Sequence, residues 1–321
     1  MALRGREGGM ATNSKWDVVV VGGINTDYLI RGETLPGSGQ TVEGEVFLQG
    51  PGGKGANQAV AAARLGARVC MVARVGHGLR GEAMIEALRE EDVDTQYVTR
   101  DEHMETGAAV IMVDQTGEKQ ILTAPGANLN VTVYDVLKAE PAIRAARVLL
   151  TQLEVPLPAV TEALRIARAN AVRTVLDPAP PRRLEQTILK DVELIKPNSN
   201  EAEVLTGIKV KERASARSAA ESLIGMGVQA VAIQAGPEGN LLVWHGGEHW
   251  LPKVPVETVD ATGAGDAFAG AMAFELARNT PLVEAAKVAN AAAAFATTKL
   301  GAQVSLPRLE DVQAILAKTA A

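Results

Sequence analysis

The 321-residue chain contains one cysteine, Cys70, which excludes a disulfide framework and a cysteine-based metal cluster. Cys70 lies in the apolar run 69–72, where we expect it to be a small core residue. Positive charge is also scarce, because 32 basic residues face 38 acidic ones and leave a net charge of −6. This balance lacks the electrostatic footprint of a nucleic-acid binder, so we expect no nucleic-acid partner.

Long hydrophobic runs are missing as well. The longest, such as residues 289–297, consist mostly of alanine and are too short to cross a bilayer, so we expect no membrane partner. Residues 1–15 lack the apolar core of a signal peptide, and we expect a disordered extension in which Met10 could be an alternative start. A cytoplasmic location follows by default.

The chain is nevertheless rich enough in hydrophobic residues, at 47%, to build a large core. The run 18–21 is continuous and apolar and ends in two glycines, which is typical of a central parallel strand buried on both faces. Strand-like and helical segments then alternate, which predicts a doubly wound, mostly parallel α/β sheet with helices on both faces. We expect one domain over residues 16–321. The predicted strands are 69–73, 148–153, 174–176, 192–195 and 230–234, and the predicted helices are 57–65, 81–91, 159–169, 184–189, 201–205, 216–226 and 282–298.

Two regions interrupt this alternation. Residues 28–49 are glycine-rich and strand-like, and residues 108–113 and 119–123 flank a turn at 114–117 that predicts a hairpin. We infer that they form a small β-sheet over the mouth of the main sheet, with lid segments near 28–50 and 105–124. Two unrelated surface hairpins are the alternative.

The segment 260–266, DATGAGD, predicts a glycine-rich turn that opens a helix. Gly263 and Gly265 allow a tight bend and a close approach to a ligand, and a helix N-terminus favours a phosphate. Asp266 would stand in the first turn, where a base could reach the group that attacks the phosphate. This combination indicates phosphoryl transfer.

Polar residues follow the first strand. Asn25 and Asp27 are two residues apart and would point the same way in extended backbone, where they could hold neighbouring hydroxyls of a ligand; an Asx turn is the alternative. The segment 52–57, GGKGAN, is not a Walker A loop, and no GxGxxG follows the first strand. Its glycines allow close backbone approach, and Asn57 could cap the next helix or bind a ligand. A structural glycine turn is the competing interpretation.

Three further segments allow two interpretations each. Glu154 ends a strand and could bind a hydroxyl or be solvated. Asn198 and Glu201 suit a capping box, which we favour, or a pair that orients magnesium-bound water. The turn 236–239 could close a hairpin or line a nucleotide. The loop 299–305, with Asp260, could coordinate a hard cation through oxygen, although loop carbonyls usually face water.

Together these motifs resemble the ribokinase family of carbohydrate kinases, from about residue 18 to residue 307. The resemblance rests on GGKGANQA, QLE at 152–154, PNxxE at 197–201, DATGAGD and LGAQxS at 300–305. It implies ATP-dependent phosphorylation of the primary hydroxyl of a sugar, D-ribose first, with Mg²⁺ and K⁺ as cofactors. The competing hypotheses are a kinase of the same fold for deoxyribose, fructose or a nucleoside, and a non-catalytic sugar sensor.

The resemblance also implies roles for single residues. Asp266 would be the base, beside the backbone amides of Gly263, Ala264 and Gly265. The sugar would contact Asp266 together with Asn25, Asp27, Gly53, Lys54, Asn57 and Glu154. The nucleotide would lie near Asn198, Glu201, Gln234, Gly236, Gly239, Gly265 and Asn290, with Glu201 organising Mg²⁺. Potassium would be enclosed by Asp260, Thr262, Ala296, Lys299, Gly301 and Ser305, mostly through main-chain oxygens, with Thr262 offering only its carbonyl.

The chain departs from the family at one position, and the resemblance has one further implication. The family has a small hydroxyl residue more often at position 234, where this chain has glutamine. The lid of the family also tends to form a dimer clasp, so the resemblance implies a homodimer through the small β-sheet.

Overall fold

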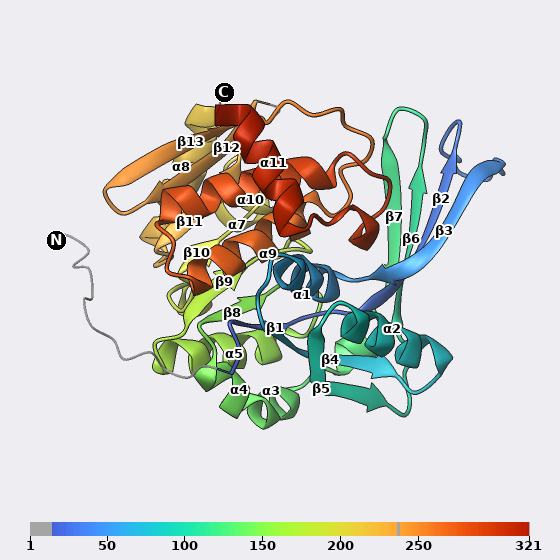
Figure 1. The fold of residues 1–321 in the computed structure, drawn as a ribbon, viewed down its shortest axis with the longest axis horizontal. Helices are drawn as coiled ribbons and strands as arrows, with labels where there is room; N and C mark the ends of the chain where they lie inside the picture. The colour runs from blue at the N-terminus through green and yellow to red at the C-terminus, as the bar shows by residue number, and fades with distance from the viewer. Residues whose placement is uncertain (1–14, 236–237, 321) are drawn as a thin grey trace.

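The computed structural model describes residues 15–235 and 238–320, and its centre is a nine-stranded sheet in the order β13-β12-β11-β10-β9-β8-β1-β4-β5 (Figure 1). The predicted extension at 1–15, except for its last residue, and Gly236 lie outside the described residues. The strands are β1 (Val18–Val21), β4 (Val69–Gly76), β5 (Val93–Asp101), β8 (Val148–Thr151), β9 (Arg173–Leu176), β10 (Leu194–Ile195), β11 (Ala230–Gln234), β12 (Gly239–Trp244) and β13 (Gly247–Pro252).

The sheet is parallel from β5 to β11, and at the other edge β12 pairs antiparallel with both β11 and β13. Its interior strand β1, between β8 and β4, is four consecutive valines, all of them 0% exposed. A run without polar alternation fits only a strand covered on both faces, which is the position that the sequence predicts. The free Cys70 is buried beside it in β4, as expected.

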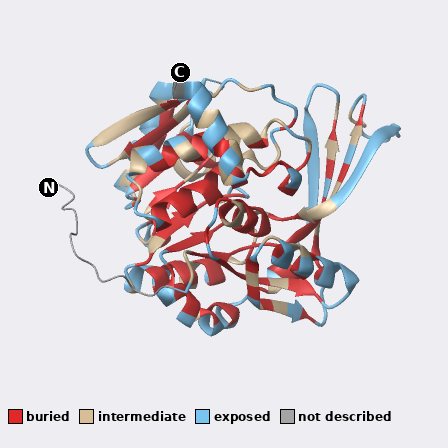
Figure 2. Cartoon of the chain, viewed as in Figure 1, coloured by how far each residue is buried: buried red, intermediate tan, exposed pale blue. Residues whose placement is uncertain are grey.

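Helices cover both faces and divide the core into two clusters, which Figure 2 shows as the buried interior. One face carries α1 (Lys54–Arg64), α2 (Leu79–Glu90), α9 (Ala264–Ala277), α10 (Leu282–Ala296) and α11 (Leu309–Ala320). The other carries α3 (Val133–Lys138), α4 (Glu140–Ala145), α5 (Leu157–Ala169), α6 (Gln186–Leu189), α7 (Ser199–Thr206) and α8 (Arg213–Gly225). The predicted doubly wound α/β architecture is confirmed. None of the helices in the described part is long and apolar enough to cross a membrane.

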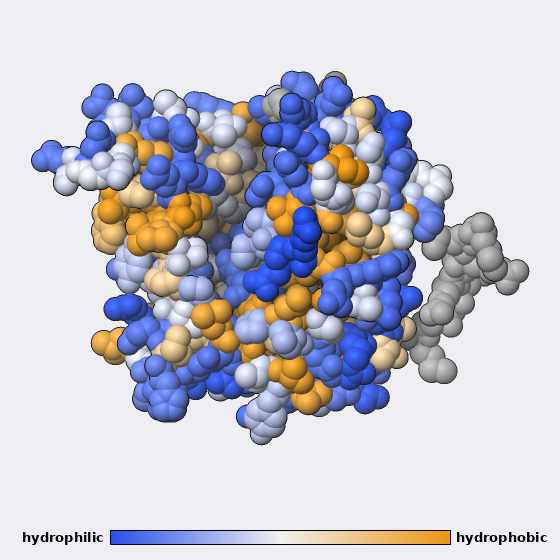
Figure 3. All heavy atoms as spheres, turned by 180° about the vertical axis from the view of Figure 1, so that it is seen from behind, coloured by the Kyte–Doolittle hydropathy of each residue, from blue (hydrophilic) through white to orange (hydrophobic). Residues whose placement is uncertain are grey.

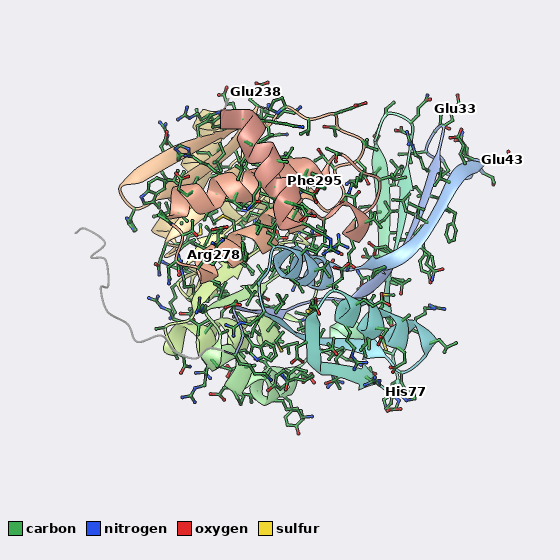
Figure 4. The ribbon with its side chains drawn as sticks, in the orientation of Figure 1. Glu33, Glu43, His77, Glu238, Arg278 and Phe295 are labelled. Atoms are coloured by element: carbon green, nitrogen blue, oxygen red, sulfur yellow. The ribbon has the colours of Figure 1, made fainter. Side chains whose placement is uncertain are left out.

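A second sheet of four strands stands beside the main body, in the order β3-β2-β6-β7. Its strands are β2 (Asn25–Gly32), β3 (Gly44–Gly52), β6 (Gly107–Val113) and β7 (Lys119–Ala124), so the two irregular regions do pair into one sheet. The inner face buries Leu29, Ala109, Ile111 and Val113. Glu33 and Glu43 lie at the far tip, away from the body (Figure 4). We call this sheet the lid.

Several elements differ from the sequence prediction. Helix α1 begins at Lys54, three residues before the predicted start, because Gly53 and not a polar side chain occupies its N-cap. Strand β5 was not predicted, since its sequence VDTQYVTRD mixes polar residues into an edge strand. Helices α3 and α4 have six residues each and are too short to show a periodic pattern.

Candidate active site

Polar segments collect at the carboxyl edge of the main sheet. Strand β1 has β4 on one side and β8 on the other, so the strand order reverses next to it. Ligands of open α/β sheets bind at such a reversal, beyond the carboxyl ends of the strands. Glu154 follows β8 there, Asp177 follows β9, and Asn198 follows β10. The lid begins at Asn25, directly beyond β1.

The glycine-rich turn adopts the predicted geometry. Gly263 is the N-cap of α9 in the left-handed region, with φ 83°, which a residue with a Cβ rarely adopts. Asp266 stands in the first turn of α9 and is 5% exposed. The amides of Ala264 and Gly265 belong to the N-terminal N–H groups, which have no acceptor within the helix. Ala264 N makes a long bond of 3.3 Å to Ala261 O outside the helix. An anion would therefore meet N-terminal N–H groups and the positive end of the helix dipole.

Asp266 is held by the first turn of α1. Asn57 Nδ2 donates to its Oδ2 at 3.0 Å, and Gln58 Nε2 donates to its Oδ1 at 2.9 Å. Lys54 Nζ lies 3.9 Å from the same Oδ1. The interpretation of Asn57 as a helix cap is wrong, because Gly53 caps α1 and Asn57 turns to the carboxylate.

Close backbone packing brings α1 to this place. A Cβ on Gly55 would lie 2.7 Å from the backbone of Gly22 and of Gly23, so only glycine lets the helix approach the end of β1. The GGKGAN glycines therefore have a structural role, and the helix that they admit also supplies polar side chains to the site.

Asn25 and Asp27 lie in β2, so they point to the same side of the lid and the Asx-turn alternative is wrong. Asn128 Nδ2 donates to Asn25 Oδ1 at 2.8 Å, which leaves the Asn25 amide nitrogen available to a ligand. Burial, with repulsion from Asp266, raises the pKa of Asp27 to about 7. Glycine also makes room here, because a Cβ on Gly52 would lie 2.1 Å from the Asp27 carboxyl carbon.

Glu154 and Lys54 complete this part of the site. The Lys54 backbone N–H donates to Glu154 Oε2 at 2.8 Å, so Glu154 is not merely solvated. Burial raises the pKa of Glu154 to about 7, although Lys54 opposes the rise. Burial alone would lower the pKa of the Lys54 ammonium, but Asp266, Asp177 and Glu154 raise it above its usual range. The pocket thus holds the charged Lys54 ammonium among three carboxyl groups, those of Asp266, Asp177 and Glu154.

Sequence reasoning assigned no role to four buried polar residues near this pocket. Gln58 Nε2 bridges Asp266 and Asp177, and Gln152 Nε2 donates to Gln58 Oε1 at 2.6 Å. Lys196 Nζ lies 3.5 Å from Asp177 Oδ1. The position of Asp177 after a buried strand was a usable signal, the same one that identified Glu154. Gln58 and Gln152 lie within the motifs GGKGANQA and QLE but were given no role, and Lys196 carries no comparable signal.

A cavity of about 590 Å³ opens between the glycine-rich turn, the carboxyl ends of β10 and β11, and the lid. Figure 3 shows the surface hollowed between the lid and the main body. Of the residues expected near a nucleotide, five line the cavity together with Gly265: Asn198, Glu201, Gln234, Gly239 and Asn290. The seventh, Gly236, lies outside the described residues.

Two of these residues are already engaged by the fold. Asn198 and Glu201 form the capping box of α7, so the favoured structural interpretation is confirmed, while both still face the cavity. Burial and the nearby Asp177 raise the pKa of Glu201. Asn290 Oδ1 accepts from Asn240 Nδ2 at 2.9 Å, and its own amide donates to Pro252 O at 2.9 Å.

The predicted cation loop meets the glycine-rich turn at Asp260. Its buried carboxylate accepts from Gly301 N at 3.0 Å, and from Thr262 N and Oγ1 at 2.9 and 2.7 Å. The Thr262 hydroxyl is engaged by Asp260, and its carbonyl remains the atom that we expect to face a cation. Ser305 lies in the 3₁₀ helix η2 (Gln303–Ser305), Ala296 ends α10, and the Lys299 ammonium covers the ring of Phe295, which lies on α10 (Figure 4). Within the described residues, no group of three or more His, Cys, Asp or Glu side chains could hold a metal.

An anion-binding turn beside a buried carboxylate, under a small lid sheet, defines a phosphotransferase. The profile of the pfkB family of carbohydrate kinases matches residues 15–309, and the chain belongs to this family. It is 37% identical to the ribokinase of Haemophilus influenzae, over 92% of this chain and 96% of that protein. It is 38% identical to mouse ribokinase, over 92% and 93%, and 33% identical to a deoxyribokinase of Salmonella typhi, over 92% and 97%.

Solved structures show the same likeness. A structure of Arabidopsis thaliana ribokinase complexed with ribose and ATP superposes with a TM-score of 0.84 at 28% identity, covering 94% of this chain and 98% of that one. The ribokinase of Thermotoga maritima gives a TM-score of 0.84 at 32% identity, covering 94% and 99%. The family predicted from the sequence motifs is therefore confirmed.

Proposed function

We propose that the protein transfers the γ-phosphoryl group of ATP to the primary hydroxyl of D-ribose, giving ribose 5-phosphate and ADP. The observation that carries this proposal is the position of Asp266, in the first turn of α9 after Gly263 and Gly265 and within hydrogen-bond distance of Asn57. Its support is the likeness to proteins named ribokinase, one of them solved with ribose and ATP. A kinase for another sugar of this class is the less favoured alternative.

In this proposal Asp266 takes the proton of the attacking hydroxyl, and the sugar oxygen forms its bond to phosphorus as the bond to ADP breaks. The backbone amides of Gly263, Ala264 and Gly265 would face the charge on the transferred group. Phosphoryl transfer asks the protein mainly for positioning and charge stabilisation. A fixed loop of amides and one placed carboxylate supply both.

The sugar would lie between the lid and the carboxyl edge of the main sheet. Asn25 and Asp27 reach it from β2, and Glu154 reaches it from the end of β8. Gly53, Lys54 and Asn57 would close the remaining side. Carboxylates of raised pKa can accept from, or donate to, vicinal hydroxyl groups, which favours a polyol over an apolar substrate.

The nucleotide would occupy the 590 Å³ cavity, against Asn198, Gln234, Gly239 and Asn290, with Gly236 nearby. Magnesium would neutralise phosphate charge there. The donor set fits an ion held by phosphates and water more than one held by a protein cage, because Glu201 uses its carboxylate to cap α7. Glu201 would then orient magnesium-bound water.

A potassium ion would lie on the other side of the glycine-rich turn. Asp260 is buried and its carboxylate accepts only neutral N–H and O–H donors among the described residues. A monovalent cation enclosed by Asp260, Ser305 and the carbonyls of Thr262, Ala296, Lys299 and Gly301 would neutralise that charge and fix the turn.

The outer face of the lid supports a homodimer through this sheet. Ile30, Phe47, Val110 and Leu122 share this face and are 40, 60, 38 and 74% exposed. Figure 3 shows hydrophobic side chains at the surface over the lid. A Phe47→Lys variant would be monomeric by light scattering if this face joins two copies. We also propose a single domain over 16–321, with its lid near 28–50 and 105–124, acting in the cytoplasm.

The test is a coupled assay of ADP release with ribose, 2-deoxyribose, fructose and a nucleoside as acceptors, with Mg²⁺ and K⁺ present. We expect ribose to give the highest kcat/KM. Asp266→Asn should lower kcat by about 10²–10⁴-fold, the usual contribution of a general base, while calorimetry still detects ribose binding. No ADP release with any sugar would refute the proposed function, and near-normal turnover of the variant would remove Asp266 as the base.

A further inference from the structure

The lysines around the cavity differ in how their charge is compensated. Lys54 lies 3.9 Å from both Asp177 and Asp266, and Lys196 lies 3.5 Å from Asp177. Lys119 donates instead to a neutral group, Thr262 Oγ1, at 3.1 Å. Within residues 15–235 and 238–320, no carboxylate lies within ion-pair distance of its ammonium. Lys119 therefore brings a positive charge that has no direct ion-pair partner among the described residues, although Asp260 and Asp266 act on it from a greater distance.

Its position in the lid directs this charge toward the site. Lys119 is the first residue of β7 and pairs with Val113, whose side chain belongs to the buried inner face of the lid. Ile121, two residues on and on the same face, lines the cavity as Lys119 does. The lysine thus reaches from the lid to Thr262, the residue directly before Gly263 in the glycine-rich turn.

The surroundings of the ammonium favour an anion. Lys119 is an exposed residue of β7, yet desolvation of its ammonium beside the cavity lowers the pKa of the group. Asp260 and Asp266 oppose this fall, and Lys54 adds to it. Asp260 already accepts from Thr262 and Gly301. The N-terminus of α9 adds further positive potential beside the lysine. A polyphosphate placed here would give the Lys119 ammonium the direct anionic partner that no carboxylate of the described residues provides.

We propose that Lys119 is a further catalytic residue, whose ammonium leaves the Thr262 hydroxyl and contacts the non-bridging oxygens of the phosphoryl group in transfer. The lysine remains protonated, the bond from phosphorus to ADP breaks as the bond to the sugar oxygen forms, and the proton goes to Asp266. This inference rests on the proposed kinase activity. It makes the lid part of the phosphate-binding apparatus in addition to its role as a cover for the sugar.

The test compares Lys119→Met and Lys119→Arg with Lys209→Met, a matched change at an exposed lysine in the loop after α7. We expect Lys119→Met to lower kcat by about 10²- to 10³-fold, in line with the loss of one charge-stabilising donor, with the KM for ribose nearly unchanged. Lys119→Arg should restore much of the rate. Lys209→Met should behave as the parent protein.

Calorimetry gives a readout that does not depend on turnover. Titrations with ATP and with ADP, without sugar, should show that Lys119→Met weakens the binding of ATP more than the binding of ADP. The reason is that only ATP carries the γ-phosphoryl group that the ammonium contacts. Equal weakening of both, or an unchanged kcat, would overturn the inference and leave Lys119 as a lid contact only. A parent protein that binds ATP but phosphorylates no sugar would refute the proposed function instead.

Discussion

Gln58 fixes the orientation of Asp266 through a hydrogen bond from its Nε2 to Asp266 Oδ1 at 2.9 Å. The same nitrogen donates to Asp177 Oδ2 at 2.8 Å, and its carbonyl accepts from Gln152. Gln58, Gln152 and Asp177 are 0% exposed, so water cannot replace any of these bonds. The proposed base, Asp266, is thus one end of a buried hydrogen-bond network that also contains Gln58, Gln152 and Asp177.

Replacing Gln58 with methionine should lower both stability and rate. The change keeps the volume but removes one hydrogen bond from each of Asp266 and Asp177, which keep Asn57 and Lys196, and leaves the Gln152 amide without its acceptor. A buried polar group left unpaired in this way costs about 1–3 kcal/mol. We expect a lower Tm and a kcat reduced by about 10-fold, because a carboxylate free to rotate is less often aligned for proton transfer. Gln186→Met, at an exposed glutamine in α6, is the control. An unchanged kcat in a folded variant would contradict this positioning role.

We expect Asn128 to affect the affinity for ribose through its hydrogen bond to Asn25, without a contact of its own to the sugar. It is 1% exposed and makes three hydrogen bonds, accepting from Ile24 N and donating to Ile24 O and Asn25 Oδ1. In Asn128→Ala the Asn25 amide loses the partner that orients it. We expect the KM for ribose to rise about 10-fold, equivalent to one good hydrogen bond, with a smaller change in kcat.

The matched control for this variant is Asn170→Ala, which removes an asparagine that bonds only to Ile166 O at the end of α5. Steady-state kinetics with ribose, together with a thermal melt of each protein, separates the two effects. If both variants lost the same stability and neither changed the KM, Asn128 would be a structural residue alone.

The sequence was most informative where local chemistry decides the structure. The DATGAGD turn, the Asn198–Glu201 cap and the lid hairpin are formed by residues close in sequence, and each was predicted. The contacts that position Asp266 could not be predicted in the same way. Gln58 and Asp266 are 208 residues apart, and only the close packing of α1 against β1 and α9 brings them together. Long-range polar pairs of this kind have no periodic pattern in the sequence.

The ligand-free protein should lose stability as the pH rises from about 4 to about 7. Asp27 and Glu154 have pKa values raised to about 7 in the folded state, from 3.8 and 4.5. The folded state therefore binds more protons than the unfolded state in this window, so the free energy of unfolding falls as the pH increases. Above pH 7 the full cost of burying the charged groups is present.

Asp27→Asn should remove part of that cost. We expect the variant to exceed the parent in free energy of unfolding by about 1–3 kcal/mol at pH 8, with the difference vanishing near pH 4, while ribose affinity falls. Urea denaturation at pH 4, 6 and 8 measures this, and Glu257→Gln, at an exposed glutamate, is the control. A variant less stable than the parent at pH 8 would show that the Asp27 charge is compensated in the folded protein.

Exchange of potassium for sodium should slow the reaction without unfolding the protein. Asp260 joins the two halves of the proposed cation site, since its carboxylate accepts from Gly301 on one side and from Thr262 on the other. A poorly fitting ion would leave this buried charge less neutralised and shift the turn that carries Gly263 and Gly265. We expect ADP release in KCl to exceed that in NaCl by about 5- to 150-fold at equal ionic strength, the usual range for coupling between two sites. Choline chloride serves as the control for ionic strength, and equal rates in all three salts would show that the loop 299–305 holds no functional cation.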